Sequence, residues 1–202
     1  MIPRYLMPEA RAGQVIGLLG GSFDPAHEGH RHLTLEAMKR FRLDRVWWLV
    51  SPGNPLKRVQ PAPMERRLAE ARRVMDHPRV TVTDLETHLN TRYTSQTLRR
   101  LIGLYPGVHF VWLMGADNLA TFHHWDEWNW IMTNVRVGVI ARPGNLMAAR
   151  VSPAAARYRF ARLSQSQAEL LGVLDPPVWC LANVPMSNAS STAIRQSGAW
   201  QR

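Results

Sequence analysis

Short apolar runs rich in branched and aromatic residues alternate with longer amphipathic stretches along most of the 202-residue chain. Apolar runs bounded by turn residues are typical of strands that are buried on both faces. We predict such strands at 15–20, 45–51, 79–84, 108–115, 135–142 and 178–183. The intervening stretches carry apolar residues at helical spacing, which predicts helices at 29–40, 64–75, 95–104 and 125–132.

The alternation of strands and helices predicts an α/β protein with a doubly wound, mostly parallel sheet. We expect residues 1–202 to form a single domain, because the length suits one core and no long linker interrupts the pattern. In such a sheet, ligands bind in the crevice beyond the carboxyl ends of the strands. The residues that directly follow each strand are therefore the candidate site residues.

The net charge of the chain indicates anionic partners but does not distinguish among their classes. Lys and Arg number 25 against 15 Asp and Glu, giving a formal net charge of +10. Such a positive field attracts nucleic acid, acidic membrane surfaces and phosphorylated small molecules alike. The densest basic segment surrounds SPAAARYRFARL, which we interpret as a solvated helix face rather than a nucleic-acid patch; its arginines are Arg150, Arg157, Arg159 and Arg162.

Two features bear on the compartment. No apolar run is long enough for a membrane span or a signal peptide, so we expect no membrane association and a cytoplasmic protein. Cys180, the single cysteine, lies in the apolar run VWCLAN, where we expect a buried, inert thiol. A disulfide within the chain is thereby excluded, as suits a reducing compartment.

The segment GGSFDPAHEGH, residues 20–30, follows the first predicted strand. Its glycines allow close backbone approach, and the following helix start offers N–H groups to an anion. The segment is neither a dinucleotide fingerprint nor a Walker loop. His27 and His30 can face one crevice, but the HEGH spacing is one residue short of the zinc-protease motif, so we expect no bound metal. The alternative is that both histidines only cap the helix.

This segment also resembles a known family. GSFDPAHEGH matches the G-x-F-D-P-x-H-x-G-H motif of nucleotidylyltransferases, and SSTAIR at 190–195 matches their second signature, S-S-T-x-I-R. Four more segments are similar to those of bacterial nicotinate-nucleotide adenylyltransferases: SPGNPLK (51–57), RYTSQTL (92–98), GADNLATFHHW (115–125) and ARPG (141–144). The resemblance spans nearly the whole chain and implies a Rossmann-like nucleotidylyltransferase fold.

The resemblance implies transfer of AMP from ATP to the 5′-phosphate of nicotinate mononucleotide, which yields nicotinate adenine dinucleotide and pyrophosphate. ATP and nicotinate mononucleotide are then the partners, with Mg²⁺ carried on the ATP phosphates. An ionised phosphate is its own nucleophile, which agrees with motifs that lack paired carboxylates. Two alternatives stay open: another adenylyltransferase with the same histidine motif, such as the pantetheine-phosphate enzyme, and a non-catalytic nucleotide-binding module.

The resemblance also assigns roles to positions. His27 and His30 become catalytic residues on the ATP phosphates, with His30 at the α-phosphate. The positions implied to bind ATP are Ser22, Phe23, Asp117, Arg142, Ser190, Ser191, Thr192 and Arg195. The positions implied to bind the mononucleotide are Gly20, Gly21, Lys57, Tyr93, Thr94 and Trp125. Of these, Trp125 would stack on the pyridine ring, and the helix start at Thr94 would bind its carboxylate.

Simpler interpretations remain for several of these positions. Lys57 reads equally as a surface lysine, and Ser190 to Arg195 as a helix N-cap followed by a surface arginine. Asp117 could simply cap a short helix. Most tryptophans in a helix such as 125–132 belong to the core, and only Trp125 aligns with the family's ring-stacking position.

Overall fold

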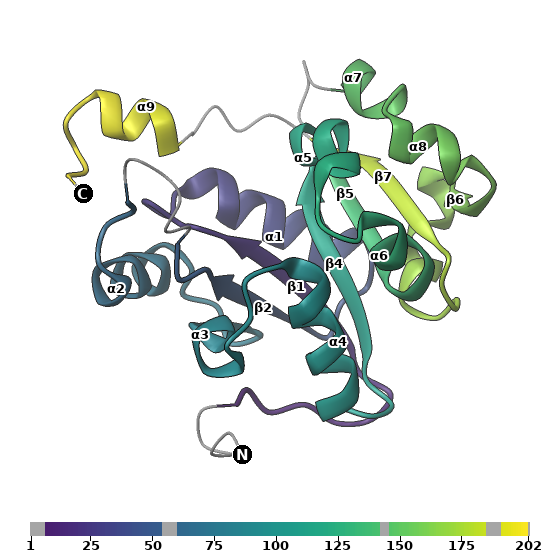
Figure 1. Cartoon of the computed structure of the whole chain (residues 1–202), viewed down its shortest axis with the longest axis horizontal. Helices are drawn as coiled ribbons and strands as arrows, with labels where there is room; N and C mark the ends of the chain where they lie inside the picture. The colour runs from purple at the N-terminus through teal and green to yellow at the C-terminus, as the bar shows by residue number, and fades with distance from the viewer. Residues whose placement is uncertain (1–6, 54–59, 142–145, 185–190, 202) are drawn as a thin grey trace.

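A parallel sheet forms the centre of the molecule in the computed structural model, which describes residues 7–53, 60–141, 146–184 and 191–201 (Figure 1). Its seven described strands lie in the order β3-β2-β1-β4-β5-β7-β6. They are β1 (Val15–Gly21), β2 (Arg45–Val50), β3 (Val80–Thr83), β4 (His109–Gly115), β5 (Arg136–Ala141), β6 (Arg162–Leu163) and β7 (Trp179–Asn183). All six predicted strands are present, and the prediction of a doubly wound, mostly parallel sheet is confirmed.

Helices cover both faces of the sheet, which is why the central strands are apolar throughout. On β2, for example, Trp47, Trp48 and Leu49 are all 0% exposed. One face packs against α1 (Glu28–Arg40), α2 (Met64–Val74) and the 3₁₀ helix η4 (Gln165–Gly172). The other packs against α3 (Leu85–Leu89), α4 (Thr94–Leu104), α5 (Ala116–Thr121), α6 (Trp128–Asn134), α7 (Leu146–Arg150) and α8 (Pro153–Arg157).

Three of the four predicted helices occur within one residue of their predicted ends, and the fourth, predicted at 125–132, is wrong at both ends, because α6 spans Trp128–Asn134. A 3₁₀ helix, η2 (Phe122–His124), ends before Trp125, and α6 begins only at Trp128. Glu127 between them has a left-handed backbone, with φ of 47°, which interrupts the helical path. Trp125 therefore lies in a connecting loop rather than in a helix.

The Ala-rich basic segment is also divided more finely than predicted. Instead of one helix it forms α8, the 3₁₀ helix η3 (Arg159–Ala161) and the edge strand β6, which pairs with β7. The indole N–H of Trp179 on β7 donates to the Tyr158 carbonyl over 2.7 Å, and this bond connects the segment to the sheet. Its four arginines are exposed, as expected of a solvated face.

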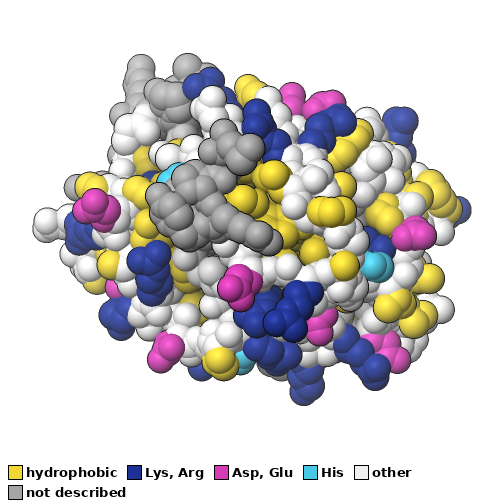
Figure 2. All heavy atoms as spheres, turned by 90° about the horizontal axis from the view of Figure 1, so that it is seen from below, with side chains coloured by type: hydrophobic (Ala, Val, Ile, Leu, Met, Phe, Trp, Pro, Cys, Tyr) yellow, Lys and Arg dark blue, Asp and Glu magenta, His cyan; other side chains and the backbone are white. Residues whose placement is uncertain are grey.

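Burial and charge follow the expectations from composition. Cys180 is 0% exposed, and burial raises the pKa of its thiol to about 11. None of the described helices is long and apolar enough to span a bilayer. On the face drawn in Figure 2, dark-blue Lys and Arg side chains occur at many places, with one group below the centre, and magenta Asp and Glu side chains lie among them.

The strand order reverses beside β1, and this reversal locates the crevice. Strands β2 and β3 lie on one side of β1, while β4, β5, β7 and β6 lie on the other. Gly21 is level with Val50 of β2, and Leu19 is level with Leu113 of β4, so the carboxyl ends of these strands meet at one edge. Parallel sheets bind ligands at such a reversal. The last described helix, α9 (Ser191–Gln196), lies at the same edge and contacts the turn before α1.

Candidate active site

The turn between β1 and α1 lies beside the reversal of strand order, at the carboxyl edge of the sheet. Phe23 has a left-handed backbone, with φ of 46°, and its ring is only 1% exposed. The ring stacks on Trp48 at 4.7 Å between centroids and contacts the His30 ring at 4.9 Å. The Phe23 side chain is therefore a packing residue beneath His30, and only its backbone could meet a nucleotide. Ser22, next to it, is exposed.

His27 and His30 lie together at the start of α1, with their ring centroids 3.9 Å apart. His27 is the N-cap residue, and its Nδ1 accepts the N–H of Gly29 over 3.0 Å. His30 Nδ1 in turn accepts the N–H of His27 over 3.2 Å. Because both Nδ1 atoms are acceptors, each neutral ring carries its proton on Nε2. The helix-capping Nδ1 and the protonated Nε2 therefore belong to the same side chains.

A second set of bonds ties the first turn of α1 to the sheet. Trp48 Nε1 donates to Thr34 Oγ1, and Thr34 Oγ1 donates to the His30 carbonyl, each over 2.8 Å. Thr34 is 0% exposed. The position of His30 is therefore held from β2 as well as by its own helix.

Arg67 of α2 supports the same turn from below and was not predicted. It is 2% exposed, and its Nη1 donates to the carbonyls of Ser22 and Ser51, each over 2.8 Å. Its Nε donates to the Ala62 carbonyl over 2.7 Å. Burial lowers the pKa of Arg67, and the negative charge of Asp24 opposes that shift. The sequence pattern does not predict this role, because an arginine in an amphipathic helix is expected to be exposed.

Residues of the second motif, which are distant in sequence from the first motif, contact the turn that contains it. Ser191 Oγ donates to the Pro25 carbonyl over 2.9 Å, and Arg195 donates to the Asp24 carbonyl. Arg195 Nη2 also donates to Thr192 Oγ1 over 3.2 Å. Three predicted ATP residues of α9 are therefore brought to the turn that leads to His27.

Trp200, which follows α9, also contacts the turn between β1 and α1. Its indole N–H donates to Asp24 Oδ1 over 2.7 Å, and the Arg66 guanidinium lies 4.3 Å from its ring centroid. No feature of the sequence pattern singled out Trp200.

The end of β4 supplies the next predicted residue. Asp117 is exposed near the start of α5, and its Oδ1 lies so close to Gly115 that a Cβ there would be 2.3 Å away. The helix α5 has Gly115 as N-cap and no side-chain cap hydrogen bond. The simpler interpretation of Asp117 as a capping residue therefore finds no support in this geometry.

The two predicted glycines differ in what surrounds them. A Cβ on Gly20 would lie 2.4 Å from the ring of Trp112, so this glycine is required by packing within the sheet. A Cβ on Gly21 would meet nothing nearer than 3.5 Å, the ring of Phe23. Of the two, Gly21 is the position whose backbone has room for a ligand.

The predicted pyridine-binding residues lie on the face of the sheet that α3 to α6 cover. Helix α4 begins at Thr94 with Tyr93 as N-cap, one residue earlier than predicted. Trp125 is half-buried, and its ring makes edge contacts with Phe122 at 5.1 Å and Trp112 at 6.2 Å between centroids. Trp125 therefore packs partly against core residues, as most tryptophans near such a helix do, and part of its side chain is exposed.

Glu86 lies beneath the start of α4 and was also missed. Its Oε1 accepts from Thr97 Oγ1 over 3.1 Å, and Thr97 Oγ1 is 2.8 Å from Thr91 Oγ1. Burial raises the pKa of Glu86 to about 7, and the bond from Thr97 opposes the shift. The three side chains connect α3 to the loop that leads into Tyr93.

Three predicted site residues lie outside the described residues: Lys57, Arg142 and Ser190. Among the described residues, no three His, Cys, Asp or Glu side chains gather as a metal site would require.

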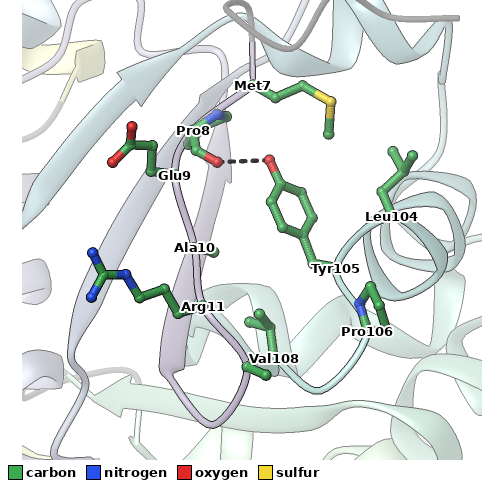
Figure 3. Close-up of a pocket in the computed structure, with 10 residues that line it drawn as sticks. Met7, Pro8, Glu9, Ala10, Arg11, Leu104, Tyr105, Pro106 and Val108 are labelled. Atoms are coloured by element: carbon green, nitrogen blue, oxygen red, sulfur yellow. Dashed lines mark hydrogen bonds between the residues drawn. The ribbon is translucent and has the colours of Figure 1, made fainter.

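A separate hollow of about 830 Å³ lies at the opposite end of the sheet (Figure 3). It is lined by residues that precede β1 and β4, and the Tyr105 hydroxyl inside it donates to the Pro8 carbonyl over 2.8 Å. None of the predicted site residues lines it. The candidate site is therefore identified from the strand ends and the motifs, and not from this hollow.

Comparison with known proteins gives the family. A family model described as cytidylyltransferase-like matches residues 18–197. A protein of Roseobacter denitrificans named probable nicotinate-nucleotide adenylyltransferase is 61% identical over 197 residues, covering 98% of this chain and 99% of the relative. The chain belongs to the nicotinate-nucleotide adenylyltransferase family. A more distant relative of the same name, from Rhizobium johnstonii, is 46% identical over 194 residues and covers 96% and 98% of the two chains.

Solved structures support the fold of this family. The nicotinic acid mononucleotide adenylyltransferase of Plasmodium falciparum, complexed with NaAD, aligns with a TM-score of 0.68 over 91% of this chain and 83% of that chain. The sequence identity is 17%, so this likeness concerns the fold alone. The predicted nucleotidylyltransferase fold is thereby confirmed.

Proposed function

We propose that the protein transfers AMP from ATP to the 5′-phosphate of nicotinate mononucleotide, giving nicotinate adenine dinucleotide and pyrophosphate. Family membership supports this reaction. The observation that carries it is the pair His27 and His30 at the start of α1, whose Nδ1 atoms both accept backbone N–H groups. Their Nε2–H groups are then donors for phosphate oxygens at the reversal point of the sheet.

The chemistry requires positioning and charge stabilisation more than acid–base groups. An oxygen of the 5′-phosphate attacks the α-phosphorus of ATP, a new P–O bond forms, and the bond to the β-phosphate breaks to release pyrophosphate. Negative charge on the α-phosphate oxygens must be stabilised as this happens, and preorganised N–H donors do this effectively. His30 is proposed to donate to the α-phosphate and His27 to the neighbouring phosphates.

The remaining ATP contacts are proposed at two places. Ser191, Thr192 and Arg195 would bind phosphate, together with Ser22, the Phe23 backbone and Ser190. A guanidinium has five N–H donors, more than the two bonds of Arg195 to Asp24 and Thr192 use. Asp117, at the end of β4, would accept from ribose hydroxyls, and Arg142 would contribute positive charge after β5.

The mononucleotide is proposed to lie on the other side of the reversal point. The backbone of Gly20 and Gly21 would approach its phosphate, with Lys57 as a further cation. Trp125 would stack on the pyridine ring. The N–H groups of the first turn of α4, from Thr94 onward, would bind the ring carboxylate, because the start of a helix favours an anion. The N–H of Tyr93 already donates to Gln96 Oε1 over 3.4 Å.

The supporting conditions follow from the same proposal. Mg²⁺ would be carried on the ATP phosphates, where it keeps several waters and needs few protein ligands. The whole of residues 1–202 would act as one domain, in the cytoplasm and without nucleic acid or membrane as partners.

A product analysis tests this function. The protein is incubated with ATP, Mg²⁺ and one acceptor at a time: nicotinate mononucleotide, nicotinamide mononucleotide or phosphopantetheine. We expect dinucleotide and pyrophosphate with the first, and much less with the second, since a carboxamide presents its own N–H donors to the helix start. Product only with phosphopantetheine, or no pyrophosphate with any acceptor, would contradict the proposal.

A further inference from the structure

The proposed pyridine site is divided between two elements that are distant in sequence. The ring would be bound by Trp125, in the loop between η2 and α6, and its carboxylate by the start of α4 at Thr94. A ligand that uses both at once needs a fixed spacing between them.

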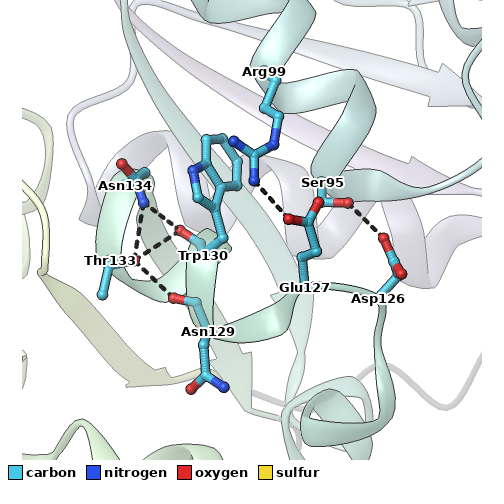
Figure 4. A network of polar contacts seen from close by, with 8 residues as sticks. All are labelled: Ser95, Arg99, Asp126, Glu127, Asn129, Trp130, Thr133 and Asn134. Carbon is cyan, nitrogen blue, oxygen red and sulfur yellow. Dashed lines mark hydrogen bonds and ion pairs between the residues drawn. The ribbon is translucent and has the colours of Figure 1, made fainter.

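Two contacts join the elements, and Figure 4 shows them side by side. Ser95 Oγ donates to Asp126 Oδ2 over 3.0 Å. Arg99 Nη2 pairs with Glu127 Oε1 over 2.7 Å, and the Arg99 guanidinium lies 3.9 Å from the ring centroid of Trp130. Both contacts run from α4 to the loop that carries Trp125.

The first contact is the closer of the two to the proposed ligand groups. Ser95 directly follows Thr94, and Asp126 directly follows Trp125. Ser95 is 0% exposed, so its hydroxyl has a defined orientation. By contrast, the Arg99 and Glu127 side chains are 44% and 47% exposed, and exposed ion pairs contribute little.

The loop itself has a backbone that depends on such contacts. Glu127 has a left-handed conformation, with φ of 47°, which is unfavourable for a residue other than glycine, asparagine or aspartate. Single hydrogen bonds of one turn hold the loop locally, from Trp125 N–H to the Phe122 carbonyl and from Trp128 N–H to the Trp125 carbonyl. These local bonds do not fix the position of the loop relative to α4. The hydrogen bond from the buried Ser95 of α4 to Asp126 does so.

We propose that Ser95 and Asp126 are positioning residues that set the spacing between the Trp125 ring and the N–H groups at the start of α4, and so determine affinity for the acid mononucleotide. This rests on the proposed function. A ligand that stacks and binds its carboxylate at once depends on that spacing. The amide analogue, which gains little at the helix start, depends on it less.

The test uses Ser95→Ala and Asp126→Ala in the full-length protein, with steady-state kinetics for each substrate. Each variant should raise KM for nicotinate mononucleotide about 3- to 10-fold, the loss expected of one hydrogen bond whose acceptor is exposed to solvent. KM for ATP and kcat should stay within about twofold of wild type. The double variant should be no worse than either single variant, because both remove the same bond.

Two further variants make the result specific. Asp126→Asn keeps an oxygen that can accept from Ser95, so it should restore most of the wild-type KM. Glu127→Ala, which breaks the neighbouring ion pair between the same elements, should leave the kinetics close to wild type. Asp126 is exposed, so Asp126→Ala should fold even if alanine at the buried Ser95 is not tolerated.

Several outcomes would overturn the proposal. An unchanged KM for nicotinate mononucleotide in Asp126→Ala would show that the Ser95–Asp126 bond does not determine the spacing between the Trp125 ring and the start of α4. A KM that falls equally in Asp126→Ala and Asp126→Asn would show that the carboxylate instead repels the substrate carboxylate from the helix start. A joint change in both KM values and kcat would indicate general loss of packing. Failure of the wild type to form the dinucleotide would refute the proposed function instead, which the wild-type control detects separately.

Discussion

A histidine ring has two nitrogens, and in His27 and His30 the backbone uses one of them. The Nδ1 bonds at 3.0 Å and 3.2 Å fix the orientation of both rings and place the proton of each neutral ring on Nε2. The capping interpretation and the catalytic interpretation are therefore compatible. Losing either ring would remove a helix cap as well as a donor, and an experiment must separate these two effects.

His30→Ala should lower kcat by about 10²–10³, the usual loss when one preorganised donor to a developing negative charge is removed. His30→Glu serves to separate the cap from the donor, because a glutamate at this helix position can still accept the N-cap N–H but has no N–H to donate. It should fold like wild type and remain slow. His77→Ala, before β3 and away from the crevice, is the matched control. Near wild-type turnover in His30→Ala would leave His30 as a capping residue only.

Glu86 predicts a pH dependence of stability with a defined sign. Its ordinary pKa of 4.5 is raised to about 7 in the folded protein, mainly by burial. Between these values the folded state holds a proton that the unfolded state has lost, so stability falls as pH rises from about 4.5 to about 7 and then levels off.

Glu86→Gln should lack this fall. Relative to wild type it should gain about 1–3 kcal/mol in the free energy of unfolding between pH 5 and pH 8. Urea denaturation of both proteins at the two pH values measures the gain. Parallel behaviour of the two proteins would mean that Glu86 titrates in its ordinary range.

At the scale of elements, α2 shows how a helix outside the crevice shapes it. Its residues follow the amphipathic pattern that the sequence predicts, yet Arg67 points inward and binds three carbonyls, those of Ser22, Ser51 and Ala62. These carbonyls lie in the loops after β1 and β2. The helix therefore holds the two loops at a fixed distance from each other.

Arg67→Ala should lower the free energy of unfolding by about 3 kcal/mol or more, since buried carbonyls lose their donor and a cavity remains. Arg67→Lys should recover only part of this loss, because one ammonium cannot reproduce the planar guanidinium fork. Arg72→Ala, an exposed arginine of the same helix, should stay within about 0.5 kcal/mol of wild type. Denaturant unfolding of the three variants decides, and equal stability of the Arg67 and Arg72 variants would refute the assignment.

At the scale of the whole molecule, the turn between β1 and α1 is joined to the C-terminal helix α9 and to Trp200. Arg195 and Ser191 of α9 reach the carbonyls of Asp24 and Pro25, and Trp200 reaches the Asp24 carboxylate. The net charge of +10 favours the approach of two polyanionic substrates to one another. The proposed ATP side and the proposed pyridine side lie on different elements and should respond separately to substitution.

Arg195→Ala should raise KM for ATP about tenfold, and Ser191→Ala less, because a guanidinium makes stronger bonds to phosphate than a hydroxyl does. The preference for the acid over the amide mononucleotide should not change. Gln196→Ala, exposed in the same helix, is the control. Kinetics with both mononucleotides, combined with circular dichroism, test this; a variant with unchanged KM for ATP would make Arg195 only a link between α9 and the Asp24 turn.

The sequence by itself determined the α/β architecture, all six long strands of the sheet and the two motifs at its carboxyl edge. It could do so because each depends on a local pattern: an apolar run, a glycine-rich turn, or a spacing of three residues between two histidines. Cys180 could be predicted as buried for the same reason. Helix ends were accurate to one residue where periodicity was regular, as in α1, α2 and α4.

Only the tertiary structure decided which side chains hold these pieces together. Arg67, Trp200, Glu86 and the Ser95–Asp126 bond join residues that are distant in sequence, and a polar residue gives no local sign of a partner so far along the chain. The position of Trp125 in a loop was likewise decided by the left-handed Glu127, a conformation that residue type alone does not predict. Local pattern thus specifies the elements, whereas long-range hydrogen bonds, which form only after the elements pack, specify the geometry of the site.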